Sequence, residues 1–190
     1  MTAGKTKRPE PIAVTVTFLE MSAPPSSYPP LPHNRPVALL KARDMPAHFY
    51  RYLMDRIGRK WHWVNALRMS DAELTEKLAE ESRDIRVLHL DGVPVGMFEV
   101  APQGPDAVEL VYFGLTEAAT GQGLGRWFLG AAIEAAWSTG PDRVTVQTCT
   151  LDHPAALPLY QKMGFSPVAQ VKETVHPMTL DERAAILVRP

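Results

Sequence analysis

The stretch ATGQGLGRWFLGAAIEAA, residues 119–136, places Gly121, Gly123 and Gly125 at every second position, directly before an apolar, alanine-rich segment. A helix N-terminus exposes unpaired N–H groups and the positive end of the helix dipole, so it attracts anions. Glycine lets an anion reach those groups because no Cβ stands in the way, and it tolerates unusual backbone angles. The stretch therefore indicates a strand, a phosphate-binding loop and a helix in succession. A tight strand-to-helix turn without a ligand is the alternative.

Two common nucleotide-binding motifs do not fit this loop. The Walker A motif requires a GK[ST] tripeptide within the loop, and residues 119–136 contain none. The dinucleotide fingerprint G-x-G-x-x-G needs its third glycine one place after Gly125. Neither a mononucleotide P-loop nor a dinucleotide fold is favoured.

The segments around the loop predict a sheet with helices on its faces. Asp91-Gly92 suits a two-residue type I′ hairpin, and Ser70 and Glu73 have the spacing of a helix capping box. An antiparallel hairpin followed by a β-α-β-α-β pattern predicts an α/β (α+β) fold with a mixed, mostly antiparallel central sheet. The predicted strands are 12–19, 85–90, 93–100, 107–115, 143–149 and 166–176, and the predicted helices are about 46–58, 71–82, 122–138 and 153–163.

Length and composition predict a single domain over residues 1–190. Six prolines in residues 22–36 indicate a linker or a wrapping arm, with a polyproline ligand for a partner domain as the alternative. The formal net charge of -1 gives no sign of a nucleic-acid partner. A single cysteine, Cys149, excludes an internal disulfide and a multi-cysteine zinc site, so we expect no metal and a cytoplasmic location. No apolar stretch reaches the roughly 18 to 20 residues that span a bilayer, so we expect no membrane partner.

Two motifs resemble the GNAT superfamily of acyl-CoA-dependent N-acetyltransferases. TGQGLG, residues 120–125, matches both small positions of the family pattern [QR]-x-x-G-x-[GA], with Thr120 at the glutamine or arginine position. LDHPAALPLYQKMGF, residues 151–165, is similar to a second signature, with Asp152 at the usual asparagine and Tyr160 at the family tyrosine. The resemblance is clear over about 84–168. It implies a GNAT-like sheet in which a splayed pair of strands holds acetyl-CoA.

The resemblance also implies where acetyl-CoA, as co-substrate, would be bound. The diphosphate would rest on backbone N–H groups of the glycine loop, and the pantetheine arm would lie along the end of strand 107–115. Asp152 belongs to the same region and is expected to cap the following helix. Gly114, late in its strand, suggests a bulge or a close backbone approach. The implied cofactor-binding residues are Phe113, Gly114, Leu115, Gln122, Gly123, Leu124, Gly125, Arg126 and Asp152.

Glu109 is the leading candidate for the base that deprotonates the amine. The strand pattern places it on the face of Val111 and Phe113, where burial would raise its pKa toward neutrality. Glu99 or a chain of water molecules are rival bases, and Glu109 could instead pair with a cation.

Tyr160 is the leading acid, because it matches the family tyrosine that protonates the departing thiolate. A packing role beneath the helix is its alternative. A covalent acetyl-cysteine on Cys149 is conceivable, but direct transfer in a ternary complex is favoured, because a lone cysteine is more often a small hydrophobe.

The acceptor is the least determined part of the prediction. Trp61 and Trp63 predict an aromatic wall for an amine, with core packing as the alternative. The acidic run 71–84 favours a solvated helix face over a guide for cationic acceptors. We expect an N-acetyltransferase acting on a primary amine of a small molecule or peptide, with a non-catalytic acyl-CoA-binding sensor as the other hypothesis. The family resemblance also allows a homodimer, at which the C-terminal sequence DERAAILVRP only hints.

Overall fold

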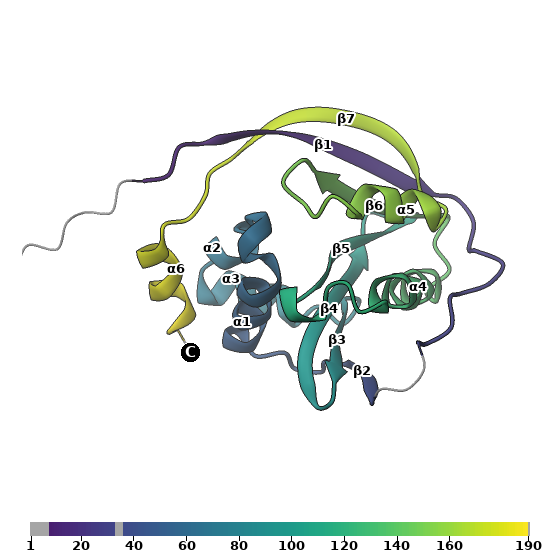
Figure 1. Cartoon of the computed structure of the whole chain (residues 1–190), viewed down its shortest axis with the longest axis horizontal. Helices are drawn as coiled ribbons and strands as arrows, with labels where there is room; N and C mark the ends of the chain where they lie inside the picture. The colour runs from purple at the N-terminus through teal and green to yellow at the C-terminus, as the bar shows by residue number, and fades with distance from the viewer. Residues whose placement is uncertain (1–7, 33–35, 190) are drawn as a thin grey trace, which may run out of the picture.

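The computed structural model describes residues 8–32 and 36–189, which form one mixed sheet with helices on both faces (Figure 1). The strands are β1 (Ile12–Met21), β2 (Val37–Lys41), β3 (Asp84–Leu90), β4 (Val93–Pro102), β5 (Ala107–Leu115), β6 (Arg143–Cys149) and β7 (Ser166–Val175). The α-helices are α1 (Ala47–Gly58), α2 (Asn65–Arg68), α3 (Asp71–Leu78), α4 (Leu124–Trp137), α5 (Ala156–Lys162) and α6 (Leu180–Leu187). Two short 3₁₀ turns, η1 (Arg59–Trp61) and η2 (Glu117–Ala119), complete the described elements.

The seven strands form one sheet in the order β2-β3-β4-β5-β6-β1-β7. All neighbours are antiparallel except β5 and β6, which run parallel. This arrangement confirms the predicted mixed, mostly antiparallel sheet. The Asp91-Gly92 hairpin is also confirmed, because both residues have the positive φ angles, 52° and 82°, that a type I′ turn requires.

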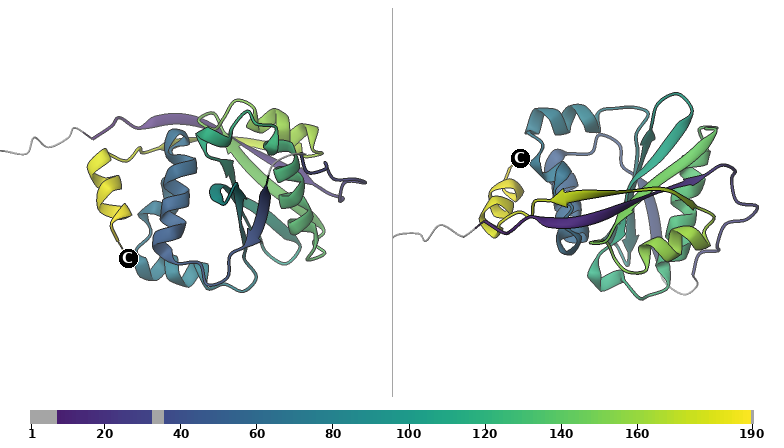
Figure 2. Two further views of the ribbon diagram at one scale, coloured as in Figure 1. Left: turned by 60° about the horizontal axis from the view of Figure 1, so that its bottom comes forward. Right: turned by 90° about the horizontal axis from the view of Figure 1, so that it is seen from above.

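The N-terminal strand takes a place in the sheet that the sequence does not predict. β1 lies between β6 and β7 and is antiparallel to both, so that Val16 is paired with Cys149 on one side and with Val171 on the other. In Figure 1, β1 and β7 run side by side as a long arch over the ends of β5 and β6. Figure 2 shows the same ribbon crossing the molecule from α4 and α5 toward α6.

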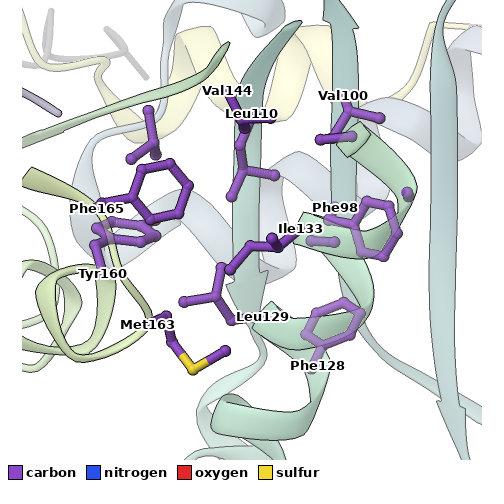
Figure 3. Close-up of a cluster of buried hydrophobic side chains, with 14 of the residues drawn as sticks. Phe98, Val100, Leu110, Phe128, Leu129, Ile133, Val144, Tyr160, Met163 and Phe165 are labelled. Atoms are coloured by element: carbon purple, nitrogen blue, oxygen red, sulfur yellow. The ribbon is translucent and has the colours of Figure 1, made fainter. Parts of the chain in front are cut away.

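Two hydrophobic clusters cover the two faces of the sheet. On one face, α4 and α5 pack Phe128, Leu129 and Tyr160 against Phe98 and Leu110 of the sheet (Figure 3). On the other face, side chains of α1, α2, α3 and α6 pack against β3 and β4. The sheet is therefore buried on both sides in its middle.

Residues 22–32 of the proline-rich stretch run along the outside of α4. A Cβ placed on Gly130 of α4 would lie 2.8 Å from the Cδ atom of Pro29, so the glycine makes room for the proline. Tyr28 packs against the same cluster as α4, and burial, followed by the charge of Glu134, raises its pKa. These residues wrap around the domain in which they occur. Residues 33–35 lie outside the described part of the chain.

Several predicted boundaries shift. The helix expected at 71–82 ends at Leu78, although its Ser70 and Glu73 capping box forms as expected. β2, α2 and α6 were not anticipated from the sequence. None of the described helices is long and apolar enough to cross a membrane. The described residues also contain no cluster of three or more His, Cys, Asp and Glu side chains suited to a metal ion.

Candidate active site

The two parallel strands at the centre of the sheet separate at their C-terminal ends. β5 and β6 pair from Ala107 and Arg143 up to Leu110 and Val146, and the pairing then stops. β5 nevertheless continues to Leu115 and β6 to Cys149. Backbone groups of β5 beyond Leu110 therefore face an opening in place of a neighbouring strand. The splayed pair implied by the family resemblance is present.

A bulge in β5 lies at the point where the strands separate. Glu99 of β4 pairs with Tyr112 and Val100 pairs with Leu110, so Val111 has no partner across the β4–β5 ladder. The extra residue reverses the alternation of side chains along the strand. The predicted face of Glu109 is consequently wrong. Glu109 shares its face with Tyr112 and Gly114, whereas Phe113 points to the opposite face and packs against Phe128 of α4.

Gly114 is required for a close approach, and the bulge lies three residues before it. A Cβ on Gly114 would lie 2.5 Å from Cγ2 of Ile57 and 2.9 Å from the ring of Trp63. Both side chains come from the helical layer that covers this face of the sheet. The absence of a side chain at Gly114 therefore lets Trp63 lie directly over the end of β5.

The glycine loop has the geometry expected of an anion-binding helix start. Gly121 and Gly123 have φ angles of 80° and 79°, and α4 begins immediately after Gly123. A Cβ on Gly121, Gly123 or Gly125 would meet no protein atom within 4 Å. Packing against other side chains thus does not require these glycines, and the space in front of the first N–H groups of α4 is open. The side chain of Thr120 turns away and donates to the carbonyl of Thr116, at 3.1 Å.

One cavity of about 890 Å³ joins this loop to the splayed strands and continues under the arch of β1 and β7. Of the residues predicted for the site, Trp61, Trp63, Glu109, Phe113, Gly114, Leu115, Gly125, Asp152 and Tyr160 line this cavity. Gln122, Gly123, Leu124 and Arg126 belong to the adjoining loop and first turn but are not part of the lining. No motif in the sequence marks the lining residues Val14, Val16, Arg68, Gln147 and Glu173 to His176.

Tyr160 is held beside the end of β5 by aromatic contacts. Its ring centre lies 5.9 Å from that of Phe165 and 6.4 Å from that of Phe113, both in edge-on arrangements. Burial, with a smaller contribution from the charge of Asp152, raises the pKa of Tyr160 well above its ordinary value. The phenol is therefore protonated at neutral pH and available as a proton or hydrogen-bond donor.

Asp152 does not cap α5, contrary to the sequence prediction. Helix α5 begins at Ala156, and its N-cap position, Ala155, makes no side-chain cap. The carboxylate of Asp152 instead accepts hydrogen bonds from Oγ1 of Thr148 at 2.8 Å and from the backbone N–H of Cys149 at 2.8 Å. Its other oxygen accepts a hydrogen bond from Nε1 of Trp63 at 3.3 Å. Asp152 therefore joins the end of β6 to Trp63.

The two tryptophans form one wall of the cavity. Trp63 packs against Tyr112 of β5 with 5.2 Å between ring centres. Trp61 contacts His153 in an edge-on arrangement with 5.4 Å between ring centres. His153 accepts a hydrogen bond from the backbone of Ala155 through Nδ1, at 3.1 Å. Both tryptophans are half-buried, so each ring packs against a neighbouring ring on one side and lines the cavity on another.

The two candidate bases differ in their surroundings. Glu109 lines the cavity, and one of its oxygens accepts a hydrogen bond from Nε2 of Gln147 at 3.0 Å. Glu99 is completely buried outside the cavity lining and bonds to Tyr50, Arg83 and Lys77. Its oxygens are thus already engaged by a hydroxyl and two cations. Of these two carboxylates, only Glu109 is positioned to meet an acceptor.

Cys149 also lines the cavity at the end of β6. Burial raises the pKa of its thiol above the ordinary value, and the nearby carboxylates add to that shift. The thiolate, which is the nucleophilic form, is therefore disfavoured at neutral pH.

The comparison with protein families matches residues 44–165 to the Acetyltransferase (GNAT) family. The chain belongs to this family, as the two motifs suggested. A comparison with curated proteins finds no match.

Solved structures share the fold at low sequence identity. An acetyltransferase of the GNAT family from Novosphingobium aromaticivorans has a TM-score of 0.59 at 15% identity, covering 86% of this chain and 64% of its own. A GCN5-related N-acetyltransferase from Kribbella flavida has a TM-score of 0.56 at 17% identity, covering 88% of this chain and 60% of its own. An aminoglycoside N-acetyltransferase, AAC(6')-Iy, in complex with CoA has a TM-score of 0.53 at 17% identity, covering 74% of this chain and 95% of its own. The chain thus spans less than two thirds of the length of the first two.

Proposed function

We propose that the protein transfers an acetyl group from acetyl-CoA directly to a primary amine of a small molecule, in a ternary complex. The observation that carries this proposal is the single cavity that joins the glycine loop, the splayed end of β5, Glu109 and Tyr160. Family membership supports acetyl-CoA as the donor. The open space beside Gly121, Gly123 and Gly125, where an added Cβ would meet no neighbouring atom, agrees with a diphosphate held at the start of α4.

The acyl thioester would enter the opening between β5 and β6. Backbone N–H groups of β5 near the Val111 bulge lack a partner strand on the β6 side, so they are available to the pantetheine arm or to the carbonyl oxygen. Donors fixed in this way stabilise the negative charge that develops on that oxygen during attack. The aromatic side chains of Phe113 and Trp63 limit the access of water to the two sides of the strand end.

The reaction needs one proton acceptor and one proton donor. Glu109 takes the proton of the attacking ammonium, because an alkylammonium with a pKa of about 10 is not nucleophilic at neutral pH. The C–N bond then forms as the C–S bond breaks, the hydroxyl of Tyr160 gives its proton to the departing sulfur, and the second proton lost by the nitrogen restores the phenol. The raised pKa of Cys149 argues against an acetyl-cysteine intermediate and supports direct transfer.

The test measures thiol release from acetyl-CoA with a panel of primary amines. Tyr160→Phe should lower kcat by about 10²-fold or more, the scale of a lost general acid, with little change in CoA affinity. Tyr112→Phe is the matched control, because it removes the hydroxyl of another tyrosine that lines the cavity and should leave kcat within a few-fold. Glu109→Gln should reduce turnover most at low pH, where more of the amine is protonated.

The outcomes separate an enzyme from a sensor. Binding of CoA without thiol release for any amine would favour a non-catalytic acyl-CoA sensor. Full activity of Tyr160→Phe would return this tyrosine to a packing role. An unaltered pH profile of Glu109→Gln would remove Glu109 as the base.

A further inference from the structure

The cavity is more negative than the chain as a whole. Its lining contains the three carboxylates of Glu109, Asp152 and Glu173 and the single guanidinium of Arg68, a net charge of −2 with the histidines neutral. The whole chain, by contrast, carries a net charge of only -1. Negative charge is therefore concentrated in this lining, where Glu109 is half-buried and Glu173 is exposed to solvent.

Two of these carboxylates lack a cationic partner. Among the described residues, no lysine, arginine or histidine forms an ion pair with Glu109 or Glu173. Asp152 is already occupied by its three hydrogen bonds. The guanidinium of Arg68 donates to the carbonyl of His176 at 2.6 Å, which holds it at the end of β7.

The two carboxylates without a cationic partner come from different walls of the cavity. Glu109 lies on β5, whereas Glu173 lies on β7, and β6 and β1 separate these strands in the sheet. Glu173 pairs with Val14, which lines the cavity together with Val16. The strip between the two carboxylates is thus made partly of aliphatic side chains from β1.

The chemistry of acetyl transfer leaves the charge of Glu173 unmatched. If the proposed function holds, the amine that attacks the thioester gives its proton to Glu109 and is then neutral. That proton neutralises the carboxylate of Glu109 but leaves the negative charge of Glu173 in place. A second ammonium on the acceptor, which keeps its proton at neutral pH, would meet this carboxylate.

We propose that the acceptor is a small diamine or polyamine, with the reacting amine at Glu109 and a second ammonium at Glu173. The aliphatic strip from Val14 and Val16 suits the hydrocarbon between the two nitrogens. A cavity of about 890 Å³ that also takes the acyl end of the cofactor fits a small acceptor. Glu173 is a specificity-determining residue in this arrangement, and it takes no part in the chemical step.

The test compares α,ω-diamines of increasing chain length with monoamines of the same length that end in a methyl group. The wild type should use the best diamine with a kcat/KM about tenfold above that of the matched monoamine, the scale of one charge-assisted hydrogen bond. Glu173→Gln should remove this preference by raising KM for the diamine about tenfold while kcat stays unchanged. KM for the monoamine should not change.

Glu20→Gln is the matched control, because it removes the same charge from the same β1–β7 ribbon at a residue outside the cavity lining. It should leave the preference for the diamine intact. Equal use of diamine and monoamine by the wild type would overturn the inference while leaving the proposed function standing. An equal loss on both acceptors in Glu173→Gln would also overturn it, because it would indicate a structural role. If no amine is acetylated, both proposals fall together.

Discussion

Substitutions at Gly125 separate the binding of the diphosphate from the stability of the fold. Gly125 is the second residue of α4, has an ordinary helical backbone, and has no protein atom within 4 Å of the place a Cβ would occupy. Alanine at this position should stabilise the protein by up to about 1 kcal/mol, because glycine is the weaker helix former. For a chain of this size the melting temperature would rise by about 2–4 °C.

Valine at Gly125 should give a different result in binding. Its helix propensity lies between those of alanine and glycine, so stability should stay within about 1 kcal/mol of the wild type. Its branched side chain, however, fills the space in front of the first N–H groups of α4. The loss of one charge-assisted hydrogen bond of about 1.5–3 kcal/mol would weaken CoA binding roughly 10- to 150-fold. Alanine should bind CoA almost normally, since the family motif accepts either glycine or alanine here.

Calorimetric titration with CoA and thermal melts of the same samples make the comparison. Gly140→Ala is a control outside the loop, because Gly140 has a φ of 73° and an alanine there is strained by about 1–2 kcal/mol. This control should melt earlier but bind CoA normally. If Gly125→Val bound CoA as tightly as Gly125→Ala, the diphosphate would lie elsewhere, and the reasoning about the glycine loop would be wrong.

Two further substitutions test the supports around the site. Asp55→Asn should destabilise the protein by about 3 kcal/mol or more, because it leaves the buried charge of Arg183 in α6 without the carboxylate that lies 2.7 Å away. Burial raises the pKa of Asp55, but hydrogen bonds from Arg59 and Arg183 outweigh it and lower the pKa overall. The stabilisation by this carboxylate should thus be complete above its pKa in the unfolded chain, about 3.9, and be lost as the pH falls through its lower pKa in the folded protein. Thermal melts of the asparagine variant should lack this pH dependence. Asp152→Asn should raise KM for the acceptor several-fold and leave CoA affinity unchanged. The reason is that an amide oxygen that still accepts from Thr148 turns the NH₂ group toward Trp63, where it cannot accept a hydrogen bond. A change in CoA affinity alone would instead assign Asp152 to the cofactor.

The parts of the fold that depend on local chemistry could be predicted from the sequence. Asp91-Gly92 tolerates the positive φ angles of its turn, so the hairpin followed directly from two residues. The alternating glycines before α4 similarly predicted the start of that helix within two residues. In both cases the signal and the structure that it specifies lie within a few residues of each other.

The parts that depend on distant partners could not be predicted. The bulge at Val111 has no glycine or proline to mark it, yet it moves Glu109 to the opposite face from the one expected. The β-branched sequence of β1 predicted a strand but carried no information about its neighbours. Asp152 had the residue type of a helix cap, but groups at the end of β6 and Trp63 satisfy its carboxylate first.

β1 and β7 contribute Val14, Val16 and Glu173 to the lining of the cavity. The family match ends at Phe165 and begins at Asp44, so β1 and β7 both lie outside it. Because side chains alternate along a strand, a slip of one residue between β1 and β7 would turn Val14 or Glu173 away from the cavity. The irregularity in this pairing lies between Phe18 and Leu19, at the far end from Glu173, and the register from Ile12 to Phe18 is continuous. The ladders on the two sides of β1 thus hold Val14 and Glu173 in a fixed relation to β6, and we propose that this segment outside the family match selects the acceptor.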